Sequence, residues 1–179
     1  MSGDVLNYNV RDFGYDWAAI EDPYVDMLTI SAKKSQLYKA IHIDGSKKSP
    51  IFNSGSEGVA EGYKSDNLVD YSSYYNYLLD QNYPFVVMAG EFDMQDGIAS
   101  QYRWMKDLLK VSSEFWTQDR KVYYYQGNDN QTKVGGYYLT EKSFALLSVP
   151  KSGHFVPADN YYASKAYIDD IVVNGTLTC

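Results

Sequence analysis

The chain has 179 residues but a single cysteine, Cys179, and no long apolar run. One thiol forms neither an internal disulfide nor a zinc or redox site, and a membrane-spanning helix needs about 20 apolar residues. Cations are also in the minority, with 16 Lys and Arg against 23 Asp and Glu and a net charge of −7. A nucleic-acid-binding face needs clustered cations. The composition therefore argues against both a membrane span and a nucleic-acid partner.

A recognisable leader is missing as well. Residues 1–8 contain no basic stretch followed by an apolar one, so they do not read as a signal peptide. Two Asn-X-Thr sequons, at Asn130 and Asn174, are nevertheless compatible with a secretory route. Either the protein is not secreted, or Met1 is not its natural start.

Two short apolar runs predict the core of a sheet. Residues 85–89, between Pro84 and Gly90, are Phe-Val-Val-Met-Ala, and residues 143–149 repeat the pattern. A continuous apolar run of this length is typical of a strand that is buried on both faces of a parallel sheet. Residues 121–125 and 135–139 predict a hairpin-like excursion.

Apolar residues at spacings of three and four predict the helices. Residues 97–109 and 159–173 form two of them, the second with Ala163, Ala166, Tyr167 and Ile171 facing inward. Residues 70–80 predict a third, with Tyr74, Tyr77 and Leu78 on one face. Weaker signals indicate a helical stretch starting at residue 31, a loop over 44–58 and a helical turn over 58–63. No repeat or linker divides the chain, so residues 1–179 are expected to have no internal domain boundary.

Each apolar strand is followed by a loop with chemistry-bearing side chains. Gly90-Glu91-Phe92-Asp93 follows the first, and a loop from Lys151 to Pro157 that contains His154 follows the second. Open α/β sheets place their sites at such strand ends. A carboxylate there can accept the imidazole Nδ1 proton and leave Nε2 free as a general base. The order acid then histidine also fits α/β-hydrolases.

These loops resemble a known family. Gly153-His154-Phe155-Val156-Pro157-Ala158-Asp159 is similar to the Gly-His-Met-Val-Pro-x-Asp of the serine carboxypeptidases, and residues 85–93 resemble that family's strand and acid loop. Residues 37–43 are similar to its Lys-Ala-Leu-His-Val stretch. The resemblance spans roughly residues 7–173. It implies a partial α/β-hydrolase fold, made of the C-terminal strands and helices of a mostly parallel sheet.

The resemblance also implies roles for individual residues. His154 would be the general base and Asp93 would orient it. Independently of the resemblance, no cofactor is expected, and no metal site is expected because no second set of ligands accompanies the paired acids Asp169-Asp170. Phe155, in place of the family's Met, would be a bulkier wall of the substrate pocket, and Glu91 would be structural. The family's acid loop continues into Cys-Asn, where this chain has Asp96-Gly97.

The nucleophile is missing. The chain contains no Gly-x-Ser-x-Gly elbow, and its nearest string, residues 53–58, has the wrong spacing and follows no apolar strand. We therefore expect a serine carboxypeptidase part that supplies the Asp and His of the triad but not the Ser, and that is inactive alone. A Ser-bearing N-terminal segment or chain and a peptide substrate would be its partners.

Several alternatives remain open. The chain could be an inactive carboxypeptidase-like remnant that acts as a binding protein. His42 is expected to be a structural histidine, and Asp169-Asp170 a solvated helix face rather than a metal site. The family resemblance implies that the protein is located in a lysosome or vacuole or is secreted. If half of the sheet is missing, the strand over 85–89 exposes unpaired backbone groups, and the isolated chain is expected to aggregate or to require a partner.

Overall fold

The computed structural model describes Asn9, Arg11, Lys39, Ala40 and His42, together with residues 57–175 and residue 177. The chain forms two compact units, residues 15–69 and residues 1–14 with 70–179. The expectation of no internal boundary stays a prediction.

The first of these units, residues 15–69, is described only in part. Its helix α3 (Glu57–Gly62) is exposed throughout and confirms the helical turn predicted over 58–63. Lys39 and Ala40 are helical. The rest of the helical stretch predicted from residue 31, and nearly all of the loop predicted over 44–58, lie outside the described residues.

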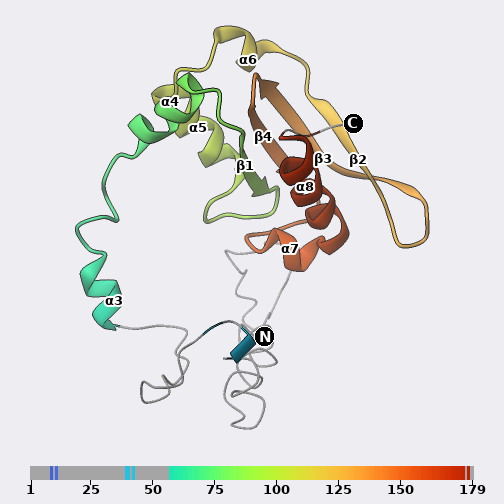
Figure 1. The fold of residues 1–179 in the computed structure, drawn as a ribbon, viewed down its shortest axis with the longest axis horizontal. Helices are drawn as coiled ribbons and strands as arrows, with labels where there is room; N and C mark the ends of the chain where they lie inside the picture. The colour runs from blue at the N-terminus through green and yellow to red at the C-terminus, as the bar shows by residue number, and fades with distance from the viewer. Residues whose placement is uncertain are drawn as a thin grey trace. The chain divides into compact units, whose positions relative to one another are not determined.

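A four-stranded mixed sheet organises the second unit (Figure 1). Its strands are β1 (Phe85–Gly90), β2 (Lys121–Gln126), β3 (Thr132–Glu141) and β4 (Phe144–Val149), in the order β1-β4-β3-β2. β1 and β4 are parallel, whereas β4–β3 and β3–β2 are antiparallel. The hairpin is thus no excursion, because it continues the sheet beyond β4.

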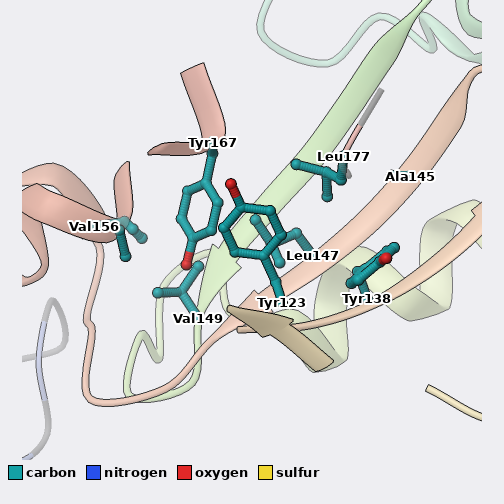
Figure 2. Packing of buried hydrophobic residues seen from close by; sticks show 9 residues of the cluster. Tyr123, Tyr138, Ala145, Leu147, Val149, Val156, Tyr167 and Leu177 are labelled. Carbon is teal, nitrogen blue, oxygen red and sulfur yellow. The ribbon is translucent and has the colours of Figure 1, made fainter. Parts of the chain in front are cut away.

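Helices cover both faces of the sheet, as an α/β fold requires. They are α4 (Ser72–Asp80), α5 (Ile98–Leu108), α6 (Ser113–Thr117), α7 (Val156–Asp159) and α8 (Tyr161–Asn174). Successive side chains of β4 point to opposite faces. Phe144 and Leu146 pack with residues of α4, α5 and α6. Leu147 packs on the other face with residues of α7 and α8, in the cluster drawn in Figure 2.

The two predicted core strands differ in burial. Every residue of β4 is buried, as predicted. β1 is only partly buried, and Met88 is 39% exposed. The reason is its position, because β1 pairs with β4 on one side and is the edge strand among the described strands.

Helix α4 buries a different face from the one predicted. Tyr74 and Tyr77 are exposed, whereas Leu79 is buried and Tyr75 packs on the rings of Phe85 and Trp104. Tyrosine serves equally well on either side of a helix, since its ring is apolar and its hydroxyl tolerates water. The helix predicted over 159–173 does bury the predicted face, with Ala163 and Tyr167 in the core.

Strand β3 contains a β-bulge at Gly135, which contacts helix α8. Tyr123 faces Gly136 and Tyr124 faces Val134, so Gly135 is the extra residue. The Tyr167 hydroxyl donates to the Gly135 carbonyl, and a Cβ at this position would lie 3.2 Å from that hydroxyl oxygen. Burial raises the pKa of Tyr167, with further contributions from the neighbouring Tyr123 and Tyr125.

Asp170 also differs from expectation. Its carboxylate is half-buried and accepts a hydrogen bond of 2.9 Å from the Tyr123 hydroxyl. It is therefore not simply part of a solvated helix face. Asp169, by contrast, is exposed and pairs with Lys165 one turn earlier.

The raised pKa of Tyr167 predicts loss of stability in alkali. Below pH about 10, this tyrosine is protonated whether the chain is folded or unfolded. Above it, the unfolded chain releases the proton while the folded chain keeps it, so the free energy of unfolding falls by up to about 1.4 kcal/mol per pH unit. Urea titrations from pH 8 to 11 should show a steeper fall for the native chain than for Tyr167→Phe. Parallel curves would contradict this.

The free edge of β1 predicts association of the isolated chain. Unpaired N–H and C=O groups on an apolar strand are a template for pairing with another chain, and a lysine on such a strand opposes it. Met88→Lys should raise the concentration at which the chain associates by about tenfold, measured by light scattering. Met94→Lys is the control, since Met94 is 71% exposed in the loop after β1. A monodisperse native monomer would contradict the prediction.

Candidate active site

The two chemistry-bearing loops leave the sheet side by side. β1 and β4 are parallel neighbours, with Gly90 opposite Val149 at their carboxyl ends. We call residues 91–97 the acid loop and residues 150–155 the histidine loop. Because both follow those strand ends, they begin at the same edge of the sheet, where open α/β folds place their sites.

Backbone contacts hold the two loops together. The Glu91 N–H donates to the Val149 carbonyl at 3.0 Å, and the Phe92 N–H donates to the Ser152 carbonyl at 2.9 Å. Gly90 makes this approach possible. A Cβ there would lie 2.2 Å from the Gly153 carbonyl oxygen and 2.4 Å from that of Ser152, far inside contact distance.

Asp93 and His154 meet across these loops. The Asp93 Oδ2 atom lies 2.9 Å from the His154 Nδ1 atom. The Asp93 side chain is 4% exposed and that of His154 is 27% exposed. The structure thus brings together the two residues that the sequence singled out, with the acid buried behind a histidine that solvent still reaches.

The acid is fixed by its own loop. Asp93 Oδ1 accepts the backbone N–H groups of Gln95 at 2.8 Å and Asp96 at 3.1 Å, so its other oxygen remains for the histidine. The turn closes tightly at Gly97, where a Cβ would lie 2.0 Å from the Asp93 carbonyl oxygen. Gly97 is also the N-cap of α5, which anchors the loop to the core.

The histidine loop is held by a carboxylate from the helix that follows it. Asp159, at the end of α7, accepts the Gly153 N–H at 2.6 Å and the Asn9 side-chain amide at 3.2 Å. Arg11 donates to the Lys151 carbonyl, and its guanidinium carbon lies 4.3 Å from the centre of the Phe92 ring. These contacts with the histidine loop were not predicted from the sequence. The sequence feature that could have indicated them is Asp159, the last residue of the Gly-His-Phe-Val-Pro-Ala-Asp motif.

The remaining predicted residues lie as follows. Phe155 meets the His154 ring edge to face, with centroids 5.1 Å apart. Glu91 is exposed and lies 3.5 Å from the Ser148 hydroxyl, a contact that suits a structural role. His42 belongs to the other unit. No group of acids, histidines and cysteines with metal-binding geometry occurs among the described residues.

This arrangement can perform one part of acyl transfer. A buried carboxylate on Nδ1 fixes the ring orientation and the Nδ1–H tautomer, which leaves Nε2 as a proton acceptor. No described residue supplies a strand-to-helix nucleophile elbow beside it, and the sequence holds no Gly-x-Ser-x-Gly.

Comparison with known families places the chain. The family model for serine carboxypeptidases matches residues 18–174, most of the chain. This chain belongs to the serine carboxypeptidase family. The match confirms the resemblance carried by the histidine and acid loops. A curated relative, serine carboxypeptidase-like 50 of Arabidopsis thaliana, is 25% identical over 136 residues.

A solved structure extends the likeness to the fold. Kex1(Δ)p, a prohormone-processing carboxypeptidase from Saccharomyces cerevisiae, matches with a TM-score of 0.66 at 17% identity. The match covers 97% of this chain but 37% of that protein, and the Arabidopsis match covers 75% of this chain and 30% of that relative. The chain therefore spans about a third of the length of these serine carboxypeptidases, and its fold is a partial α/β-hydrolase. None of the helices described here is long and apolar enough to cross a membrane.

Proposed function

We propose that this chain is the acid–base part of a serine-type carboxypeptidase. His154 is the general base, Asp93 orients it, and the nucleophilic serine comes from a separate serine-bearing segment or chain. The 2.9 Å contact between Asp93 Oδ2 and His154 Nδ1 carries the proposal. It is supported by the burial of the acid and by the position of both loops at one edge of the sheet.

The chemistry follows the order of a serine hydrolase. His154 Nε2 takes the serine proton as the oxygen attacks the carbonyl carbon of the last peptide bond. The same proton then goes to the nitrogen of the departing amino acid, leaving an acyl-enzyme. Water attacks that ester with His154 again as the base, and the shortened peptide leaves. Without the serine the first step cannot occur, so the chain alone is inactive.

Phe155 is proposed to contact the substrate. Its ring lies against that of His154 and is only partly buried, so it borders the place where the leaving group must receive its proton. Phe155 is bulkier than the Met that the family has at this position. It would therefore narrow the substrate pocket and favour smaller residues at the substrate's C-terminus.

The edge of β1 is the proposed contact for the serine-bearing segment. Its backbone pairs only with β4 among the described strands, and it leads directly into the acid loop. A strand added there would bring its own carboxyl end next to Asp93 and His154, if it ran parallel to β1.

Passage through the secretory route is proposed from the sequons and from family analogy. Asn130 and Asn174 are both exposed, the first in the β2–β3 turn and the second at the end of α8. Glycosylation at either would suit a vacuolar, lysosomal or secreted protein. Treatment of the native protein with an N-glycosidase should lower its mass, and an unchanged mass would contradict this.

The competing proposal is an inactive carboxypeptidase-like remnant that acts as a binding protein. One observation favours it: the chain itself contains no Gly-x-Ser-x-Gly. The two proposals differ in whether a serine-bearing segment exists in the cell.

Sequencing the native transcript upstream of Met1 separates these proposals. The enzyme proposal expects an in-frame extension that encodes a nucleophile elbow, or a separate serine-bearing chain that co-purifies. The native protein or complex should then react with a fluorophosphonate probe and release the last residue of N-blocked dipeptides. An in-frame stop before Met1, together with no labelled partner, would overturn the enzyme proposal in favour of the remnant.

A further inference from the structure

The acid loop contains a second carboxylate close to the histidine. Asp96 Oδ2 lies 3.8 Å from His154 Nδ1, the nitrogen that already contacts Asp93. This distance is too long for a hydrogen bond but suits an ion pair with a charged imidazole. The Asp96 side chain is 62% exposed, whereas that of Asp93 is 4% exposed.

The loop places this carboxylate with its backbone fixed and its side chain able to move. The Asp96 N–H donates to Asp93 Oδ1, and the Asp96 carbonyl accepts from the Gln101 side-chain amide at 3.0 Å. Across the described part of the chain, its carboxylate has no other hydrogen bond or ion pair than the one with His154. A change of rotamer costs an exposed side chain little free energy, and a movement of about 1 Å would bring the Asp96 carboxylate to hydrogen-bond distance of His154 Nδ1.

We propose that Asp96 is a second acceptor for the Nδ1–H group of His154, which preserves the Nδ1–H tautomer when the bond to Asp93 opens. Asp96 is then a positioning residue that acts through His154. The inference deepens the general-base role proposed for His154 and rests on it. It concerns a position at which this chain departs from the family's Cys.

The hydrogen bonds of Asp93 suggest how to isolate this role. In an Asp93→Asn variant, the amide oxygen must stay where Oδ1 accepts the Gln95 and Asp96 N–H groups, because an NH2 group cannot accept them. The NH2 group therefore faces His154 Nδ1 and donates to it, which favours the wrong, Nε2–H tautomer. Any Nδ1–H tautomer that remains must be held by another acceptor.

The test measures the tautomer of His154 directly. The full chain is labelled with 15N, and the imidazole nitrogens are observed at mildly alkaline pH. The chain has only two histidines, so His42→Gln assigns the signals. In Asp93→Asn a fraction of Nδ1–H should persist. Adding Asp96→Asn should lower the ratio of Nδ1–H to Nε2–H by about tenfold or more, because a charged acceptor is lost.

Two further variants make the result specific. Asp93→Asn with Asp96→Glu should restore the Nδ1–H fraction, since the longer carboxylate still reaches. Asp93→Asn with Asp107→Asn is the matched control, because Asp107 is an exposed acid on α5 that pairs with Arg103. Equal tautomer ratios with and without Asp96, at equal foldedness by circular dichroism, would overturn the proposal.

A second measurement covers failure of Asp93→Asn to fold. With Asp93 intact, Asp96→Asn should speed exchange of the Nδ1-bound proton with water by about threefold or more, because each opening then lacks a second acceptor. An unchanged exchange rate would overturn the proposal. Neither measurement needs a serine or a substrate, so failure of carboxypeptidase activity and failure of this inference are distinguishable.

Discussion

Replacing Gly90 by alanine is expected to lower the free energy of unfolding by about 3 kcal/mol or more. The added methyl group would lie 2.2 Å from the Gly153 carbonyl oxygen, 2.4 Å from the Ser152 carbonyl oxygen and 2.7 Å from the Ser152 carbonyl carbon. These are backbone atoms, and Ser152 is fully buried, so no side-chain rotation relieves the clash. The histidine loop has to move.

The same change is expected to separate the acid from the base. Gly90 stands between the two loops, so a shift of the histidine loop away from β1 also lengthens the contact between Asp93 and His154. Denaturant unfolding measures the first effect, and the NMR signal of the His154 Nδ1–H group reports the second.

Gly62→Ala is the matched control for this substitution. Gly62 ends α3, and a Cβ there would meet nothing within 4 Å. Adding a methyl group to an exposed helical glycine should be neutral or stabilise by less than about 1 kcal/mol. If Gly90→Ala unfolds within about 0.5 kcal/mol of the native chain, the close packing of the two loops described here is wrong.

The sequence predicts the elements of the second unit well because their periodicities are local. The run over 143–149 is apolar except for Ser143 and Ser148, and β4 is buried at every position. Residues 97–109 carry a clear stripe, and α5 buries Met105 with Leu109 directly after it. Such patterns need no knowledge of distant neighbours.

The predictions from the sequence are wrong where residues far away along the chain, or too few residues for a periodic pattern, determine the structure. The burial of β1 depends on how many strands lie beside it, and its own residues do not record that. The stripe on α4 was ambiguous because tyrosine suits either face. Helix α6 was missed although Ser112 caps it and Phe115 is buried, since five residues are too few for a periodic pattern.

The two main residues of the candidate site could be predicted from the sequence, but the contacts that hold their loops in place could not. Asp93 and His154 each follow an apolar strand, and the family resemblance of both loops implied the pairing. Contacts from Asn9 and Arg11 join residues about 140 to 150 positions apart, and nothing in a single sequence marks them. The position of Asp96 depends on the turn around Asp93, in which the Asp93 Oδ1 atom accepts two backbone N–H groups.

The largest effect on activity is expected at the Asp93–His154 pair in the complete, serine-bearing enzyme or complex. His154→Gln removes the base, and Asp93→Asn presents an NH2 group to Nδ1 and favours the wrong tautomer. In serine hydrolases the acid-to-amide change lowers kcat by about 10⁴-fold, and loss of the histidine lowers it by about 10⁶-fold. The two should be non-additive, because the acid acts only through the histidine, so the double variant should be no slower than His154→Gln alone.

The control substitutions replace an aspartate and a histidine that lie outside the candidate site. Asp107→Asn removes an exposed acid on α5, and His42→Gln removes the other histidine, which belongs to the other unit. Both should keep kcat within about twofold on N-blocked dipeptides. Losses that multiply in the Asp93/His154 double variant would show that the two residues act separately, and His154→Gln with native kcat would remove His154 from catalysis. A kcat reduced equally by all four single changes would point to lost folding, because an exposed acid on α5 and a histidine of the other unit have no common chemistry with the pair.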